Sequence, residues 1–194
     1  MNKPFSQACE NNKKPILEVI TPYFQGGGSV LEIGSGTGQH GVFFASHLPN
    51  LQWHTSDRVE NHEGIGLWIS EAGLSNLHLP VTLDVRAGQW PLAEFDGVFS
   101  ANTAHIMSWP EVVAMFEGVG RVLSSGGFFC LYGPFNDHGR FTSDSNARFD
   151  QHLKARASHM GIRNFEAVDE LANENCLKLV KDHAMPANNR TLVW

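Results

Sequence analysis

The segment Val30-Leu-Glu-Ile-Gly-Ser-Gly-Thr-Gly38 decides the fold of this chain. Its mainly apolar start is followed by glycines at alternate positions 34, 36 and 38, and residues 39–48 then have the apolar spacing of a helix. Glycine adopts positive φ without strain and lets a ligand approach the backbone, and a helix start offers free N–H groups and a positive dipole end. The pattern predicts a strand, a ligand-binding glycine turn and a helix.

Two ligand classes fit this turn. A dinucleotide fingerprint, Gly-x-Gly-x-x-Gly, can be read at Gly36, Gly38 and Gly41. Because that fingerprint should begin directly after the strand, where Gly34 already stands, it begins two residues late. The register Glu-x-Gly-x-Gly-x-Gly instead gives Glu32 a role, since a carboxylate buried in a strand needs hydrogen bonds. Glu32 would tie the turn together and face a cationic ligand; a plain turn without a ligand is the remaining alternative.

Composition sets limits on the function. The chain has 194 residues, 42% hydrophobic and 18% charged, which suits one globular domain over residues 1–194. A net charge of −6 without a basic run disfavours nucleic acid as a partner. Three cysteines without metal-ligand spacing fit a reducing cytoplasm and no metal site. We see no apolar run of signal-peptide or membrane-spanning length, so we expect a cytoplasmic protein.

Helical and strand patterns alternate along most of the chain. Such alternation predicts a parallel sheet with right-handed crossovers, in a three-layer α/β/α sandwich. A tight connection between the last two strands makes that pair antiparallel. The predicted strands cover residues 30–33, 51–57, 81–85, 95–101, 128–132, 177–185 and 191–194, and the predicted helices cover residues 14–24, 39–48, 61–72, 110–123, 145–157 and 165–175.

Carboxylates end the second and third predicted strands. Asp57 follows Gly38 by nineteen residues, a nucleotide-binding spacing that predicts hydrogen bonds to ribose hydroxyls. A helix cap or a surface charge is the alternative. Arg58 could cover an adenine face or bind the 2′-phosphate of a dinucleotide. Asp84 beside the N–H of Val85 could read an adenine edge, although a turn-forming aspartate is equally compatible.

These features resemble the nucleotide site of class I S-adenosylmethionine-dependent methyltransferases. Other segments resemble one small family of methyltransferase-like proteins, found in bacteria and with a mammalian member. The resemblance implies a Rossmann-like fold with seven strands in the order 3-2-1-4-5-7-6 and an antiparallel last strand, and it implies S-adenosylmethionine as cofactor and S-adenosylhomocysteine as product. The segments are FSQACENNKKPIL (residues 5–17), LEIGSGTGQH (31–40), YGPF (132–135) with SNARFD (145–150), and MPANN (185–189).

The resemblance also implies which residues hold the cofactor. In the superfamily the segment after the fourth strand lies under the methionine part of the cofactor and faces the acceptor. His105 in this segment is the first candidate for a general base, because its ordinary pKa suits proton removal near neutral pH. A histidine packed at the rim is the alternative, since methyl transfer can run on positioning alone. The implied cofactor residues, besides Glu32, Asp57, Arg58, Asp84 and Val85, are Gly34, Ser35 (often alanine in the family), Gly36, Thr37, Gly38, Ala101 and Asn102.

Two further regions are expected to close the site. If a cap formed by residues 1–28 folds over the carboxyl edge of the sheet, Asn12 reaches the carboxylate of the cofactor. Residues 133–165 are expected to form a substrate lid, although a solvated loop is the alternative. For Asn188 the alternative is ordinary turn chemistry. The candidate substrate residues are Tyr132, Asn136, His138, Arg140, Asn146 and Asn188.

Three functions remain open at this point. The first is methyl transfer from S-adenosylmethionine to a small polar molecule, which needs no metal. The second is a cofactor-binding module or partner subunit without catalysis, suggested by the lack of a recognisable acceptor motif. The third is a compact NAD(P)-dependent oxidoreductase, which the register of the glycine turn disfavours.

Overall fold

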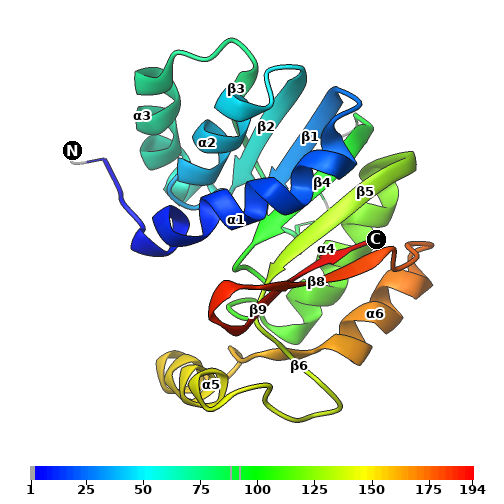
Figure 1. Ribbon diagram of the computed structural model, residues 1–194. Helices are drawn as coiled ribbons and strands as arrows, with labels where there is room; N and C mark the ends of the chain where they lie inside the picture. The colour runs from blue at the N-terminus through cyan, green and yellow to red at the C-terminus, as the bar shows by residue number, and fades with distance from the viewer. Residues whose placement is uncertain (1–2, 88, 92) are drawn as a thin grey trace.

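A seven-stranded sheet runs through the molecule and carries helices on both faces (Figure 1). The computed structural model describes residues 3–87, 89–91 and 93–194, and its strands have the order β3-β2-β1-β4-β5-β9-β8. β9 pairs antiparallel with β5 and β8, and the other pairs in this sheet are parallel. The expected strand order and antiparallel last strand are therefore confirmed.

The bounds of the elements are as follows. The strands are β1 (Gly28–Ile33), β2 (Leu51–Asp57), β3 (Leu77–Thr82), β4 (Phe95–Ala101), β5 (Leu123–Gly133), β6 (Phe135–Asn136), β7 (Arg163–Asn164), β8 (Lys181–Met185) and β9 (Asn189–Val193). The helices are α1 (Gln7–Phe24), α2 (Gln39–His47), α3 (His62–Ala72), α4 (Trp109–Val122), α5 (Asp144–Arg156) and α6 (Phe165–Glu174), with short 3-10 turns η1 (Val59–Asn61) and η2 (Pro186–Asn188).

A hydrophobic core on each face holds the helices on the sheet. α1, α2 and α3 pack on one face around residues such as Phe44, and α4 and α6 pack on the other around Phe116. β1 serves both cores, because Val30 faces the first and Leu31 the second. Its carboxyl end, where the glycine turn begins, therefore lies at the centre of one edge of the sheet.

The first helix begins earlier than the sequence pattern predicts. α1 starts at Gln7 instead of residue 14, with Ser6 as N-cap accepting a hydrogen bond from the Cys9 N–H at 3.4 Å. The prediction was wrong because residues 7–13 are polar, and this first part of the helix contacts polar groups instead of the apolar core. Of the predicted cap, residues 1–2 lie outside the described part of the chain.

The third strand also lies elsewhere than predicted. β3 covers Leu77–Thr82 instead of residues 81–85, and Pro80 stands within it. Proline is tolerated there because β3 is an edge strand, and Leu79 is 68% exposed, so no buried run marks the strand. Asp84 consequently lies in a turn after the strand and does not end it.

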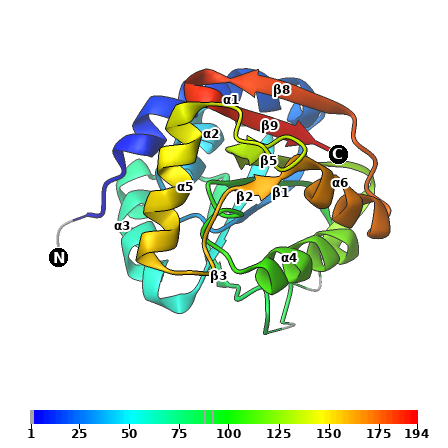
Figure 2. The same ribbon diagram turned by 90° about the horizontal axis from the view of Figure 1, so that it is seen from below.

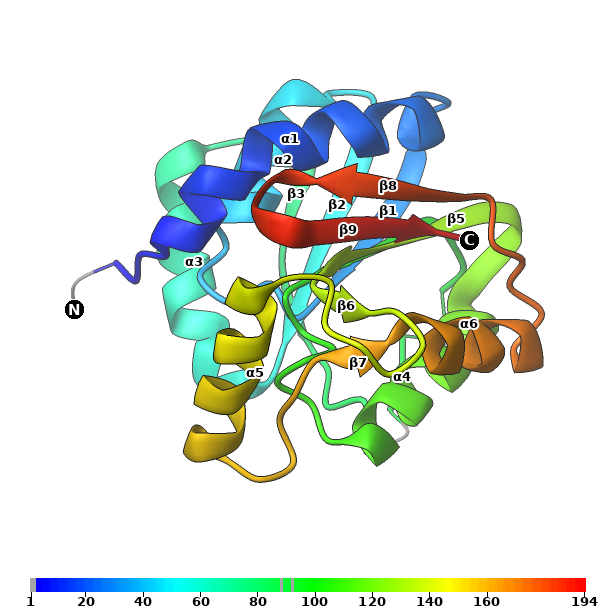
Figure 3. The same cartoon turned by 60° about the horizontal axis from the view of Figure 1, so that its bottom comes forward.

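The region after β5 has more structure than expected. Phe135–Asn136 and Arg163–Asn164 form a small parallel sheet of their own, and the sequence pattern predicts no strand at either place. Figures 2 and 3 show α5 and this β6–β7 pair at the carboxyl edge of the main sheet. The amide of Asn146 in α5 donates to the Asn188 carbonyl at 3.0 Å, which ties this region to η2.

Residues preceding α1 lie across α3. The Trp68 indole N–H donates to the Pro4 carbonyl at 2.7 Å, while the Lys3 ammonium lies 3.7 Å from the centre of a Trp68 ring and 2.6 Å from the Glu71 carboxylate. A Cβ atom on Gly64 would lie 2.7 Å from Pro4 Cγ. A glycine at position 64 therefore lets the chain before α1 pack against α3.

We predict that Gly64→Ala is less stable than Gly66→Ala by about 1–3 kcal/mol, because the new methyl group must displace Pro4. Both glycines lie in α3, where alanine gains about 1 kcal/mol of helix propensity, and nothing lies within 4 Å of a Cβ on Gly66. Urea unfolding of both variants measures the difference. Equal free energies of unfolding would show that Pro4 does not constrain this helix.

Candidate functional site

The glycine turn between β1 and α2 has three glycines in the left-handed region. The φ angles of Gly34, Gly36 and Gly38 are 71°, 59° and 88°. The N–H groups of Gly34 and Ser35 both donate to the Ser56 carbonyl, at 3.0 and 2.9 Å, so β2 holds the turn. Nothing lies within 4 Å of the position that a Cβ would take on Gly36. The turn is thus fixed on one side and open on the other.

Glu32 supports the turn from behind. Its Oε2 atom accepts hydrogen bonds from the Ser35 hydroxyl at 3.0 Å and from the Trp53 indole N–H at 3.1 Å. A Cβ on Gly41 would lie 2.9 Å from this carboxylate, so Gly41 is explained by the packing of α2 on the sheet. Burial raises the pKa of Glu32 to about 7, and the charge of Asp57 adds to the shift. Glu32 therefore ties the turn together, as expected, but it is 2% exposed and lies behind the turn.

Asp57 stands beside the open side of the turn. Its Oδ2 atom accepts from the Gly36 N–H at 2.7 Å, and its Oδ1 atom accepts from the Arg58 N–H at 2.7 Å and from the Asn61 amide at 2.8 Å. A carboxylate offers about four acceptor sites, so these three bonds leave capacity for a ligand hydroxyl. The structure brings Asp57, Arg58 and the glycine turn together.

Asp84 lies on the same edge of the sheet as Asp57. The N–H of Leu83 donates to the Asp57 carbonyl at 2.9 Å, which brings the residue before Asp84 next to Asp57. The Oδ1 atom of Asp84 accepts from the Arg86 N–H at 3.0 Å, and the side chain of Val85 is buried in a core. This is the geometry of a turn-forming aspartate, and contact with adenine stays a prediction.

His105 lies in a buried position near the end of β4. It is 6% exposed, and its ring lies 5.2 Å from that of Phe149 at an angle of 73°. Burial lowers the pKa of His105 to about 4, with a further contribution from the charge of Arg163. The guanidinium of Arg163 donates to the Ala104 carbonyl at 2.9 Å and so fixes this segment. These features favour the alternative of a packed, uncharged histidine over that of a general base.

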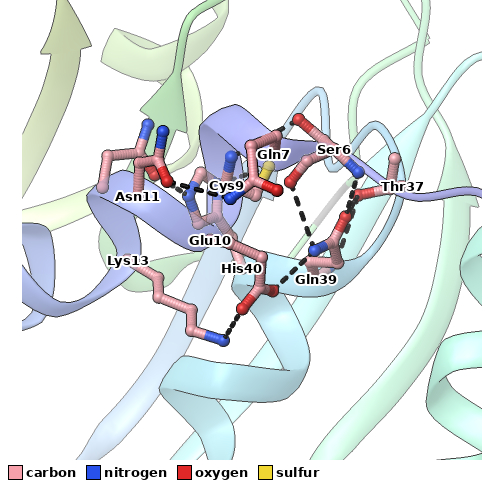
Figure 4. A network of polar contacts seen from close by, with 10 residues as sticks. Ser6, Gln7, Cys9, Glu10, Asn11, Lys13, Thr37, Gln39 and His40 are labelled. Atoms are coloured by element: carbon pink, nitrogen blue, oxygen red, sulfur yellow. Dashed lines mark hydrogen bonds and ion pairs between the residues drawn. The ribbon is translucent and has the colours of Figure 1, made fainter.

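A polar network joins the start of α1 to the glycine turn (Figure 4). The Oε1 atom of Gln39 accepts from the Ser6 N–H at 2.6 Å and from the Thr37 hydroxyl at 3.0 Å. Its amide donates to a Glu10 carboxylate oxygen at 2.6 Å, and Glu10 forms an ion pair with Lys13. We call this set the N-terminal clamp. The Gln-His pair that ends the LEIGSGTGQH segment was the available signal for it, and sequence analysis missed its role.

His40 extends the clamp to Asn12. Its Nε2 atom lies 2.7 Å from the Asn12 Oδ1 atom, and its ring stacks on Phe44 at a centroid distance of 5.3 Å. Burial lowers the pKa of His40 to about 4; Glu10 opposes the shift and Lys13 adds to it. Since an amide oxygen only accepts, the neutral imidazole donates from Nε2. This bond fixes the orientation of the Asn12 amide at the start of α1.

A cavity of about 420 Å³ opens between α1, α5, η2 and the ends of β4 and β5. These elements are far apart in the sequence, and α5, within the region 133–165, supplies one wall. Three predicted substrate residues, Tyr132, Asn146 and Asn188, line it together with the predicted cofactor residues Asn12 and Asn102. The remaining lining residues, which sequence analysis did not assign to the site, are Ala8, Asn11, Pro15, Pro134, Ser145, Phe149, Pro186, Ala187 and Asn189.

Three predicted substrate residues lie outside this cavity. His138 and Arg140 line a separate hollow with Phe141, and His138 lies 3.3 Å from the Glu166 carboxylate. Asn136 is buried in β6, with its amide 3.5 Å from the Ile162 carbonyl. The structure therefore does not bring these three residues to the cavity.

The cavity adjoins the glycine turn through the segment after β4. A Cβ on Gly34 would lie 2.7 Å from Thr103 Cγ2, so this segment packs directly on the turn. Asn102 has a φ angle of 58°, and its N–H donates to the Tyr132 carbonyl at 2.9 Å. Ala101, the last residue of β4, precedes it. The open side of the turn and the cavity thus belong to one edge of the sheet.

The described residues offer neither a metal site nor a membrane-spanning helix. No three His, Cys, Asp or Glu side chains gather there in a way that could hold a metal ion. No helix in the described ranges is long and apolar enough to cross a bilayer.

The sheet order and helical layers define a Rossmann-like methyltransferase fold. Solved structures that match include an O-methyltransferase family protein from Burkholderia thailandensis (TM-score 0.80, 14% identity, 96% of this chain and 56% of that chain). The apo S-adenosylmethionine-dependent methyltransferase SibL also matches (0.80, 21%, 96% and 55%), as does PigF, described with SAH (0.78, 13%, 96% and 63%). The chain spans less than two thirds of these proteins, and at such identities the likeness concerns the fold.

A protein-family model matches nearly the whole chain as well. The model is described as "Protein of unknown function (DUF938)" and covers residues 3–194. The chain belongs to this family.

We predict that Glu32→Gln makes the protein more sensitive to acid. In the fold the pKa values of His40 and His105 are about 4, against an ordinary 6.5, so their contribution to stability is lost as the pH falls from 6.5 to 4. Glu32 acts in the opposite sense: its pKa is about 7, against an ordinary 4.5, so its contribution is lost as the pH rises from 4.5 to 7. Near pH 5.5 the unfolded chain therefore binds roughly one net extra proton, and roughly two without Glu32.

Urea unfolding between pH 5 and 6 measures this effect. From these three groups we expect the free energy of unfolding to fall by roughly 1 kcal/mol for each pH unit of acidification in the wild type. In Glu32→Gln we expect it to fall by roughly 2 kcal/mol. Glu60→Gln, at an exposed residue of η1, is the matched control and should keep the wild-type slope. If Glu32→Gln also keeps the wild-type slope, Glu32 does not titrate as a buried group.

Proposed function

We propose that this protein transfers a methyl group from S-adenosylmethionine to a small polar molecule and releases S-adenosylhomocysteine. The observation that carries the proposal is the glycine turn, which is open above Gly36, faces Asp57 and adjoins a cavity of about 420 Å³. Backbone N–H groups at the start of α2 and a carboxylate with remaining acceptor capacity suit an adenosine ligand. The likeness to solved methyltransferases supports the same function.

The residues present fit this cofactor. Asp57 would hold the ribose, Asp84 and Val85 the adenine edge, and Arg58 would flank the adenine. The backbone of residues 34–38 would line the floor of the site, with Glu32 behind it, and Ala101, Asn102 and Asn12 would surround the methionine part. When bound, S-adenosylmethionine supplies a methyl group on a positively charged sulfur, which is electrophilic without a metal or a covalent enzyme intermediate.

The contribution of the chain to the reaction is mainly positioning. α1 and α5 stand on either side of the cavity and would exclude water from it. The proposed base, His105, has a pKa of about 4 and lies next to Phe149 instead of lining the cavity. A histidine so weakly basic is a poor match for proton removal near neutral pH, which supports transfer by alignment alone.

The lining of the cavity is also compatible with a second function, cofactor binding without catalysis. No Asp, Glu, His, Lys or Arg side chain is among the described residues that line the cavity. A cofactor-binding module without catalysis would be built in the same way. Turnover of methyl-labelled cofactor in cell extract distinguishes the two functions, because only an enzyme consumes the label faster than extract alone.

We predict that Gly36→Ala weakens binding of S-adenosylhomocysteine by about tenfold or more. The new methyl group would occupy the open space above the turn, where the proposed ligand lies. Gly73→Ala is the matched control, because Gly73 also has nothing within 4 Å and has a φ angle of 60° against 59° for Gly36. Gly73 caps the far end of α3, so both variants carry a similar backbone strain of about 1–2 kcal/mol.

Titration calorimetry measures both affinities. The Gly73→Ala variant should bind S-adenosylhomocysteine as the wild type does. Equal affinities for both variants would remove the glycine turn from the ligand site, and no heat of binding with the wild-type protein would overturn the proposed function.

A further inference from the structure

The described residues that line the cavity include many polar side chains and no charged ones. Six of its described lining residues are asparagines, at positions 11, 12, 102, 146, 188 and 189, and Tyr132 and Ser145 add hydroxyl groups. Three prolines and Phe149 supply apolar walls between them. Such a lining can hydrogen-bond a ligand but offers no counter-ion to a charged one.

Hydrogen bonds within the protein orient two of these asparagines, Asn146 and Asn189. Asn146 is 5% exposed, and its NH₂ group donates to the Thr142 hydroxyl at 3.1 Å and to the Asn188 carbonyl at 3.0 Å. Asn189 similarly donates to the Pro186 carbonyl at 3.1 Å and to the Ala187 carbonyl at 3.4 Å. Because the N–H groups are used, the amide oxygens remain to accept hydrogen bonds from a ligand.

The opposite wall is oriented in the same manner. Asn12 is 9% exposed, and its oxygen accepts a hydrogen bond from His40 at 2.7 Å, so its NH₂ group remains to donate. Tyr132 also lines the cavity, and its hydroxyl has a proton to donate. The cavity thus has defined acceptors on the α5 and η2 side and a hydroxyl on the α1 side.

Backbone strain gathers at the same place. Of the five described non-glycine residues with positive φ, three line the cavity: Asn102 at 58°, Ala187 at 57° and Asn188 at 58°. Strained residues of this kind persist where the surrounding structure holds them, and they cluster at ligand sites. The conformation of η2 therefore serves the cavity as well as the connection between β8 and β9.

The charged residues that the cavity could have used lie elsewhere or pair with each other. Glu10 and Lys13 form an ion pair, and Lys13 lies 4.9 Å from the centre of the Phe43 ring. His138 and Arg140, the lid residues predicted to meet a substrate, line a separate hollow. An acceptor that carried a net charge against the wall formed by α5 and η2 would lose its hydration without gaining an ion pair with the described lining residues.

We propose that the methyl acceptor bound in this cavity is an uncharged, partly apolar molecule that carries hydroxyl or N–H donors. The inference rests on the proposed function and narrows it, since a small polar acceptor could otherwise be acidic or basic. Carboxylated, phosphorylated and cationic metabolites are excluded as acceptors.

Three matched probes test the charge preference. Catechol, 3,4-dihydroxybenzoate and 3,4-dihydroxybenzylamine share a ring and two hydroxyls but differ in net charge. With S-adenosylhomocysteine at saturation, the side-chain NH₂ signals of ¹⁵N-labelled protein are followed during titration with each probe. We expect catechol to shift the Asn146 and Asn188 signals and to bind about tenfold or more tightly than either charged probe.

A charge introduced into the cavity supplies the second arm. Asn188→Asp should reverse the preference, so that the benzylamine binds more tightly than catechol. Asn50→Asp makes the same change at an exposed residue in the turn after α2 and should keep the wild-type order. Reversal in the first variant alone would support the proposal.

The outcomes separate the two proposals. If the wild-type protein binds no S-adenosylhomocysteine, the proposed function fails. If it binds the cofactor product but the benzoate or the benzylamine binds at least as tightly as catechol, only the acceptor inference is overturned. Absence of catechol shifts at tens of millimolar probe, or shifts confined to residues away from the cavity, overturns it as well.

Discussion

The hydrogen bond from the Ser35 hydroxyl to the buried Glu32 carboxylate is the contact on which the site depends. The same hydroxyl accepts from the Ser56 N–H at 3.1 Å, so one side chain links the turn to both β1 and β2. Held there, the turn aims the Gly36 N–H at Asp57. A carboxylate with a pKa of about 7 in this position is tolerated because its bonds to Ser35 and Trp53 offset part of its burial.

The N-terminal clamp carries this order outward to the cavity. Gln39 and His40 begin α2, directly after the turn, and they hold Ser6, the N-cap of α1, and Asn12 within that helix. Asn12 lines the cavity together with Tyr132, near the end of β5. The position of α1 over the cavity therefore follows from the position of the turn, which explains why polar residues occupy the first part of a helix that is otherwise apolar on its inner face.

The sequence predicted those features that depend on local patterns. The central strands are mainly apolar, so their existence and order followed from the alternation of patterns and from the family resemblance, although β5 begins at Leu123 instead of residue 128. The start of α1 and the bounds of β3 did not, because polar contacts and an exposed edge strand with Pro80 leave no periodic signal. The convergence of Asn12, Asn146 and Asn188 on one cavity depends on long-range packing. These three residues lie in the family segments, but their positions along the chain do not predict that they line the cavity while His138 and Arg140 do not.

Burial favours the uncharged form of several titratable side chains around the turn. Burial keeps His40 and His105 uncharged near neutral pH, and it also favours the protonated form of Glu32. Asp57 by contrast accepts hydrogen bonds from uncharged amide donors, of Gly36, Arg58 and Asn61, and among the described residues no cation pairs with its oxygens. A carboxylate held in this way suits hydroxyl donors such as those of a ribose. On the far side of Asn102 the cavity continues this pattern, because its described lining residues carry amide and hydroxyl groups and no charged side chain.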